Sequence, residues 1–161
     1  HLSIRRQRQM CIRDSYSYRM TNIQAAIGLS QINHLDKIIT AKRNLAKQYT
    51  AALRDIDEIS IPVEKNYAKN VFWMYGIVLN KNININAKTF AKRLLAKGID
   101  TRPFFLGMHE QPVLKQRGLF LNETYPVTEK LSRKGLYLPS GVNLTNDEIK
   151  RICNAIRESL N

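Results

Sequence analysis

The sequence contains little cysteine and no long uninterrupted run of apolar residues. Its two cysteines, Cys11 and Cys153, lie far apart and show neither Cys-x-x-Cys nor Cys/His spacing, which argues against a disulfide framework and a structural zinc site. The longest apolar candidate, Val71–Leu79, is interrupted by Gly76 and is much shorter than the roughly 18 residues of a membrane helix. Because no apolar signal segment is visible either, we expect a cytoplasmic protein with no membrane partner.

Short motifs of common enzymes are missing as well. The chain has no Gly-x-Gly-x-x-Gly, no Walker loop, no His-Glu-x-x-His and no Gly-x-Ser-x-Gly. Its three histidines are His1, His34 and His109, and none belongs to a recognisable metal-ligand pattern. We therefore assign no metal site from the sequence, and any binding function has to be sought in less regular patterns.

What the chain does have is a globular composition with an excess of positive charge. Its 161 residues are 43% hydrophobic and 24% charged, which is typical of one folded domain. The net charge is +13, from 26 basic and 13 acidic residues. Such a charge can indicate a nucleic-acid partner, but outside the arginine-rich first fifteen residues the basic side chains are scattered, as on a solvated surface. A small basic nucleic-acid-binding domain therefore stays an alternative, although we expect no specific nucleic-acid partner.

Helical spacing dominates the first half of the chain. Thr21 and Gln24 fit a capping box, and apolar residues then recur every three or four positions until about Leu53. This pattern predicts a single helix that is unusually long for a globular domain. Because a helix of that length often packs on a partner subunit, a stand-alone dimerisation module is a further alternative.

The second half of the chain predicts a small sheet with additional helices. Val71–Leu79 is β-branched and aromatic and is expected at the centre of the sheet, with Ile99–Arg102 as the strand beside it, ended by Pro103. Helices are predicted at 87–97, where Gly98 can end the helix, at 111–117, at 127–134 and from 145 onward, and a short extended segment at 135–139. Thr145 and Glu148 fit a capping box for the last helix, and Cys153 lies on its apolar stripe and is expected in the core. The predicted fold class is α+β, with one long helix and a small, mainly antiparallel sheet that carries two or three helices on one face.

A first candidate binding segment, Tyr16–Asn22, precedes the long helix. It contains Ser17 and Arg19, and the backbone amides at a helix N-terminus favour negative charge. An arginine can bind a carboxylate or phosphate through two parallel hydrogen bonds, so the segment can form an anion site. The alternative is that Arg19 makes an ordinary ion pair at the surface.

A second candidate is the loop RPFFLGMH at residues 102–109, which follows a predicted strand. Loops at the ends of strands often carry functional side chains, and this one ends in His109. Two interpretations are open from the residues alone. Either His109 faces a ligand, or the two phenylalanines fill the core and His109 caps the next helix.

Several motifs, taken together and in order, resemble one known family. YRMTNIQAAIGL at 18–29, FWMY at 72–75, RPFF with MH and QP at 102–112, and GLYLPSG at 135–141 are similar to the C-terminal part of the DegT/DnrJ/EryC1/StrS sugar aminotransferases, especially their GDP-perosamine synthase-like members. The resemblance covers residues 16–161. We interpret these as the C-terminal domain of a longer enzyme, and residues 1–15 as a non-family segment, disordered or artefactual, with a basic arm as the alternative.

The resemblance implies a pyridoxal-phosphate enzyme of fold type I, with the chain corresponding to its small C-terminal domain. Such an enzyme would act as a homodimer and move an amino group from glutamate to a 4-keto-6-deoxy nucleotide sugar. The lysine that carries the cofactor belongs to the large N-terminal domain of the family. No lysine here matches that motif, so we assign no catalytic residue and expect the fragment to be inactive alone.

The family's site residues can be carried over at four positions. Ser17 stands where the family usually has asparagine, and it is expected to contact the cofactor phosphate, with a shorter reach. Arg19 matches an arginine expected to bind an anionic group of the cofactor or substrate. Phe105 and His109 match positions near the sugar substrate, whereas Arg102 is interpreted as structural.

Overall fold

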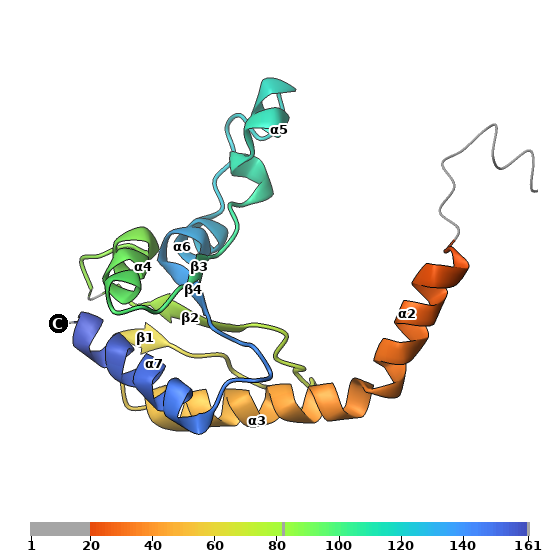
Figure 1. Cartoon of the computed structure of the whole chain (residues 1–161). Coiled ribbons are helices and arrows are strands. Elements are labelled where there is room, and N and C mark those ends of the chain that lie inside the picture. Colours follow the sequence, from red (N-terminus) through yellow and green to blue (C-terminus); the bar gives the residue numbers. More distant parts are fainter. Residues whose placement is uncertain (1–19, 82, 161) are drawn as a thin grey trace, which may run out of the picture. The chain divides into compact units, whose positions relative to one another are not determined.

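The computed structural model describes residues 20–81 and 83–160 (Figure 1). The chain divides into two compact units, residues 1–37 and 38–161, which are considered separately. The expectations for residues 1–15, and those for Ser17 and Arg19, lie outside the described residues. Within the described ranges, no helix is both long enough and apolar enough to cross a membrane.

The predicted capping box at Thr21 is confirmed. Helix α2 (Asn22–Asn33) begins where the Gln24 amide donates to the Thr21 hydroxyl at 3.3 Å and the Thr21 amide donates to the Gln24 side chain at 2.8 Å. The expectation of one continuous helix to Leu53 is wrong, because α2 ends at His34 and a separate helix α3 (Leu35–Leu53) follows. The His34 ring, through Nδ1–H, donates to the Ser30 carbonyl at 2.8 Å, which is the acceptor that the His34 amide would use in an unbroken helix.

The sheet is antiparallel throughout the described residues, in the order β1 (Ile59–Ser60), β2 (Tyr75–Leu79), β4 (Gly135–Leu138) and β3 (Arg102–Pro103). This confirms the predicted antiparallel sheet, with one error of order. The strand from the 99–102 region lies beside β4 rather than β2. Pro103 is part of that strand instead of ending it, because an edge strand tolerates a residue without an N–H.

Strand β2 is also shorter than the predicted Val71–Leu79. Lys42 and Arg43 of α3 donate to the carbonyls of Trp73 and Asn70, which holds this stretch against α3 rather than in the sheet. Phe72 adopts a positive φ of 49°, a conformation incompatible with a continuing strand. The β-branched and aromatic pattern at 71–79 is therefore longer than the strand that forms at Tyr75–Leu79.

The remaining helices follow the predicted positions. They are α4 (Ala87–Ala96), the 3₁₀ turn η1 (Met108–Glu110), α5 (Pro112–Gln116), α6 (Pro126–Lys134) and α7 (Asn146–Leu160). Gly98 takes a φ of +75° just after α4, which confirms its predicted role at the helix end. Thr145 and Glu148 form the predicted capping box of α7.

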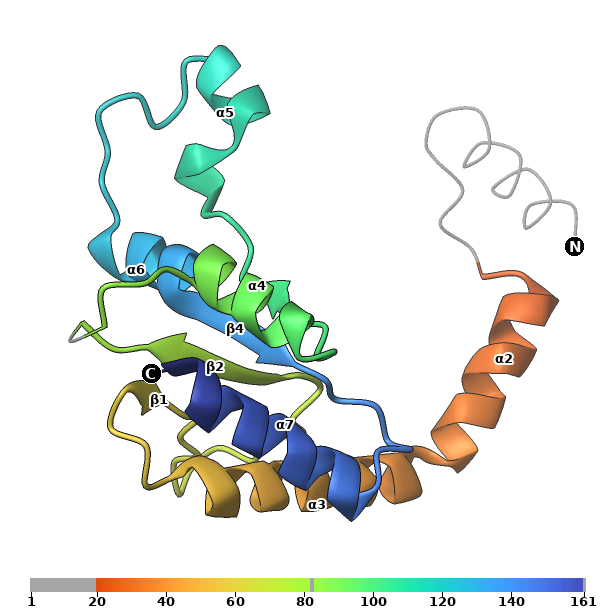
Figure 2. The ribbon, with the colours of Figure 1, turned by 60° about the vertical axis from the view of Figure 1, so that its left-hand side comes forward.

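One face of the sheet carries the hydrophobic core. Alternate residues of β2 and their partners on β4 point to this face, where they join buried side chains of α3, α4 and α7 in one cluster. Figure 2 shows α7 running beside α3, and Arg157 of α7 donates to the Ala52 carbonyl at 2.6 Å. Cys153 is buried in this core as predicted, and burial raises the pKa of its thiol to about 11. The expected helices on one face of the sheet are therefore present.

The opposite face is covered locally by Phe104. A Cβ at Gly76 would lie 2.6 Å from the Phe104 ring, and one at Gly135 would lie 2.3 Å from it, so both strands need glycine at this crossing. The ring also packs on Tyr137, with 4.4 Å between centroids. From Phe104 the chain leaves the sheet, passes through η1 and α5, and returns at α6 (Figure 2).

Replacing Ile77 by alanine is expected to destabilise the chain strongly. Its side chain is fully buried at the centre of the core face, and deleting such a side chain costs about 2–5 kcal/mol. Urea denaturation of the full chain measures the change in the free energy of unfolding. Leu95→Ala is the control, since Leu95 is 60% exposed on α4. Equal losses in the two variants would contradict the assigned core.

Candidate functional site

Residues 104–125, termed the arm, contain both sequence-predicted residues of the second site. Phe105 is 79% exposed and is free to meet a ligand, whereas His109 in η1 is only 6% exposed. The arm projects away from the sheet in both views (Figures 1 and 2). Several of its other large apolar side chains are also exposed: Leu106, Met108, Val113, Leu119 and Leu121.

The His109 ring lies between the arm and α6. Its Nε2 is 3.3 Å from Glu129 Oε1, and its ring centroid is 4.8 Å from that of Tyr125. The same Glu129 oxygen accepts a hydrogen bond from the Tyr125 backbone amide at 3.1 Å. His109 therefore has a buried, well-defined setting on α6.

The alternative interpretation of this loop is only partly met. Phe104 packs against the sheet, but Phe105 does not fill the core. His109 does not cap the next helix, because α5 begins at Pro112 with Gln111 as its N-cap residue and has no side-chain capping bond. Neither interpretation of the sequence described the buried contact of His109 with Glu129 and Tyr125.

Charged groups complete the surroundings of His109. Glu110 Oε2 lies 4.0 Å from Nε2, and Glu110 Oε1 is paired with Arg133 at 2.6 Å. The pKa of Glu129 is held below its ordinary value. The largest cause is the hydrogen bond from the Tyr125 amide, followed by the hydrogen bond with the His109 ring and the charge of Arg133. Sequence reasoning missed these partners, since Glu129 and His109 are twenty residues apart and no local pattern pairs them.

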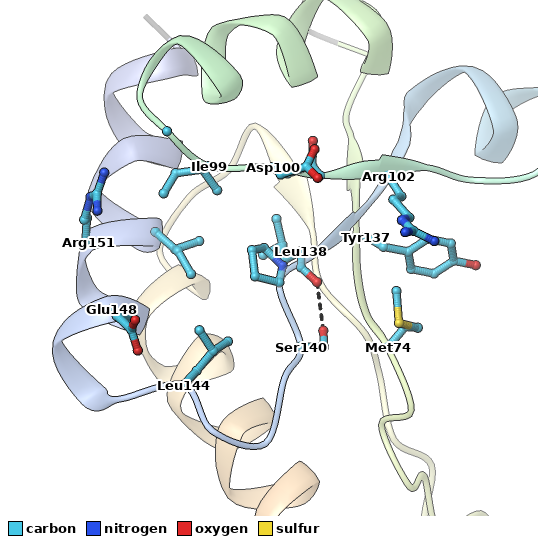
Figure 3. Close-up of a pocket in the computed structure, with 14 residues that line it drawn as sticks. Met74, Ile99, Asp100, Arg102, Tyr137, Leu138, Ser140, Leu144, Glu148 and Arg151 are labelled. Carbon is cyan, nitrogen blue, oxygen red and sulfur yellow. Dashed lines mark hydrogen bonds between the residues drawn. The ribbon is translucent and has the colours of Figure 1, made fainter.

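A cavity of about 410 Å³ lies at the end of the sheet next to α7 (Figure 3). Arg102 and Tyr137 line one end of it, and Glu148 and Arg151 line the other. Because the two arginines lie at opposite ends and an acidic side chain stands beside Arg151, they do not form a single anion clamp. Arg102 is exposed on β3, and its side chain has no ion-pair partner among the described residues.

The partly buried amines of Lys42 and Lys134 are hydrogen-bonded. Lys42 donates to the carbonyls of Trp73 and Ser140, and Lys134 donates to those of Ile83 and Ile85, at 2.9 and 2.6 Å. Both amines are thus occupied as hydrogen-bond donors to backbone carbonyls. Across residues 20–81 and 83–160 there is also no group of three or more His, Cys, Asp or Glu side chains able to hold a metal ion.

A family model described as the DegT/DnrJ/EryC1/StrS aminotransferase family matches residues 3–157 of the chain. The chain belongs to this family. The matched range begins inside residues 1–15, which were expected to be a non-family segment. This membership agrees with the resemblance seen in the motifs and gives no support to a nucleic-acid-binding domain or a stand-alone dimerisation module.

Individual relatives and solved structures match about nine-tenths of this chain. The chain is 33% identical over 147 residues to GDP-perosamine synthase of Vibrio cholerae, covering 91% of this chain and 39% of that protein. Its fold matches Helicobacter pylori PseC, an aminotransferase involved in the biosynthesis of pseudoaminic acid, with a TM-score of 0.81 at 20% identity, over 91% of this chain and 39% of that one. It also matches Escherichia coli GDP-4-keto-6-deoxy-D-mannose-3-dehydratase with bound hydrated PLP, with a TM-score of 0.75 at 20% identity, over 89% and 37% of the two chains. The chain thus spans well under half the length of these proteins.

The contribution of Glu129 to stability is expected to depend on pH. Since its pKa is lowered in the folded state, the unfolded chain takes up the proton first as the pH falls. The stabilisation is therefore complete above the ordinary pKa of a glutamate and is lost as the pH falls through the lowered value. The difference in unfolding free energy between the wild type and Glu129→Gln should have its full size at about pH 5 and should shrink as the pH falls below about 4.

Asp57→Asn is the control for this measurement, because the Asp57 side chain is exposed and has no ion-pair or hydrogen-bond partner among the described residues. Denaturant titrations at a series of pH values compare both variants with the wild type. A gap for Glu129→Gln that widens as the pH falls below about 5 would have the wrong sign and would refute the assigned interactions.

Proposed function

We propose that the chain is the C-terminal part of a pyridoxal-phosphate-dependent aminotransferase that transfers an amino group from glutamate to a 4-keto-6-deoxy nucleotide sugar. The family match over residues 3–157 carries this proposal. The similarity to GDP-perosamine synthase of Vibrio cholerae supports the nucleotide-sugar substrate. The proposed compartment is the cytoplasm.

The cofactor, when bound, supplies the electron sink that allows an amino group to move between two carbon atoms. The described residues show no lysine prepared to carry it, since the partly buried amines of Lys42 and Lys134 are held by carbonyl oxygens. We therefore place the cofactor lysine in a part of the longer protein that this chain does not include. The family resemblance assigns to Ser17 and Arg19 the binding of the cofactor phosphate and of a substrate anion.

Helix α2 supports an assembly larger than this chain. It has no charged residue, none of its residues is buried, and its large apolar side chains Ile23, Ile27, Leu29 and Ile32 are at least 60% exposed. Several large apolar side chains exposed on an uncharged helix are normally covered by other protein. We propose that the longer protein is a homodimer that covers α2, with the Ser17–Arg19 segment, which precedes α2, reaching the partner's site.

The arm is proposed to lie at the sugar substrate. Phe105 is exposed and can wall the binding site, and His109 is positioned at the base of the arm. The catalytic step would still depend on the lysine outside this chain. The chain alone is therefore expected to have no transaminase activity.

Incubation of the chain with pyridoxal phosphate should label no single lysine stoichiometrically. After reduction with borohydride and digestion, mass spectrometry should find only scattered, substoichiometric labels, because exposed amines react without selectivity. Lysozyme treated in parallel gives the background level. One fully labelled lysine would contradict the proposal that the cofactor lysine lies elsewhere.

In the longer enzyme, recovered from the reading frame upstream, Arg19→Ala should weaken binding of the cofactor or substrate. Loss of a charge-assisted hydrogen bond costs about 1.5–3 kcal/mol, or roughly ten- to hundredfold in affinity. Arg19→Lys should restore only part of it, because an ammonium lacks the planar fork of the guanidinium. Steady-state kinetics with glutamate and a GDP-linked 4-keto-6-deoxy sugar measure both effects.

Arg54→Ala is the matched control, because Arg54 is exposed just after α3, lies outside the arm and has no side-chain hydrogen-bond or ion-pair partner among the described residues. Unchanged kinetics in both Arg19 variants would remove Arg19 from the site. If the longer wild-type enzyme consumes the keto sugar without incorporating the amino nitrogen of glutamate, the proposed transamination is wrong.

A further inference from the structure

The pairing of His109 with Glu129 fixes the proton of the imidazole ring. An ionised carboxylate can only accept hydrogen bonds, so the nitrogen facing it at 3.3 Å has to carry the hydrogen. That nitrogen is Nε2. In the neutral ring, Nδ1 is then the nitrogen with a free lone pair.

Glu129 is itself held in place for this role. Its Oε1 accepts from the Tyr125 backbone amide at 3.1 Å as well as from His109, and its Oε2 lies 3.9 Å from Arg133. Its pKa is lowered by these contacts, so the group is a carboxylate at neutral pH. Tyr125 also packs its ring on the imidazole, which fixes the ring plane. Both the position and the orientation of the His109 ring are therefore determined by α6 and the residue preceding it.

The other edge of the ring lies against Gly107. A Cβ at this position would lie 2.6 Å from His109 Cε1 and 2.7 Å from Nδ1, so any side chain here would displace the ring. Because His109 is only 6% exposed, its ring is packed between Gly107 and the Glu129 carboxylate.

We propose that Glu129 is a positioning residue, which holds the His109 ring in its Nε2–H form and thereby fixes the base of the arm that carries Phe105 to the bound keto sugar. The pairing of Glu129 with His109 stands on the geometry of this chain, and its effect on sugar binding rests on the proposed function. Glu129 acts through the histidine, as a carboxylate does when it fixes the tautomer and orientation of an imidazole.

Nitrogen-15 NMR of the labelled full chain tests the pairing without any activity assay. The wild type should show His109 with a protonated Nε2 whose hydrogen exchanges slowly enough with water to be observed. Glu129→Ala should accelerate that exchange at least about tenfold, as expected for the loss of a charge-assisted hydrogen bond. Glu110→Gln is the matched control and should leave the signal unchanged, because Glu110 is 4.0 Å from the ring.

Two further variants keep the test decisive if Glu129→Ala does not fold. Glu129→Gln retains an oxygen for the Tyr125 amide but removes the charge, and it should give intermediate exchange. Gly107→Ala should abolish the slow Nε2–H signal by displacing the ring, although Glu129 is intact. A wild-type signal from Nδ1–H, or a slow Nε2–H signal that survives in Glu129→Ala, would overturn the pairing.

Kinetics of the longer enzyme test the effect on sugar binding separately. Glu129→Ala should raise KM for the keto sugar about tenfold or more, with KM for glutamate unchanged. An unchanged KM for the sugar, in an enzyme that is otherwise active, would refute the positioning role in sugar binding while leaving the pairing intact. A wild-type enzyme without transaminase activity would refute the proposed function, whereas the NMR result would still decide the role of Glu129.

Discussion

Tyr75, Ile77 and Leu79 of β2 are fully buried against the helices on one face of the sheet, and the remaining features of residues 38–160 depend on this burial. The hydroxyls of two core tyrosines, Tyr49 and Tyr75, are paired. The Tyr49 hydroxyl donates to the Pro139 carbonyl at 2.9 Å, and the Tyr75 and Thr50 hydroxyls lie 2.9 Å apart. Because these bonds satisfy the polar atoms of large aromatic side chains, the core can use tyrosines without the cost of unpaired hydroxyls. The sheet is thereby fixed on α3, α4 and α7.

With one face committed to the core, the other face is available to anchor the arm. Phe104 can lie flat over the two central strands only because Gly76 and Gly135 have no side chains. This contact fixes the point at which the arm departs, and the Glu129 and Tyr125 contacts with His109 fix the arm again near its return to α6. Two attachments, one apolar and one polar, hold a segment whose other large side chains are exposed. An arm held in this way can present Phe105 to a ligand at little entropic cost.

The sequence by itself determined the class of the fold and the family. Apolar spacing, capping boxes at Thr21 and Thr145, and the turn at Gly98 are local signals, since each depends on residues within one or two helical turns. They predicted most of the helices, the antiparallel sheet with its helices on one face, and the core position of Cys153. The ordered motifs from residue 18 to residue 141 identified the aminotransferase family, which the family match bears out.

Only the tertiary structure decided the features that depend on residues distant in sequence. The order of the strands, with β4 between β2 and β3, and the shortening of β2 by Lys42 and Arg43 arise from contacts across more than twenty-five residues. The break at His34 depends on a side chain that displaces a backbone donor, a competition that apolar periodicity does not reveal. The surroundings of His109 were equally invisible in the sequence. A histidine in a loop has the same local pattern whether it faces solvent or a carboxylate, and only the packing of the arm on α6 brings Glu129 to its ring.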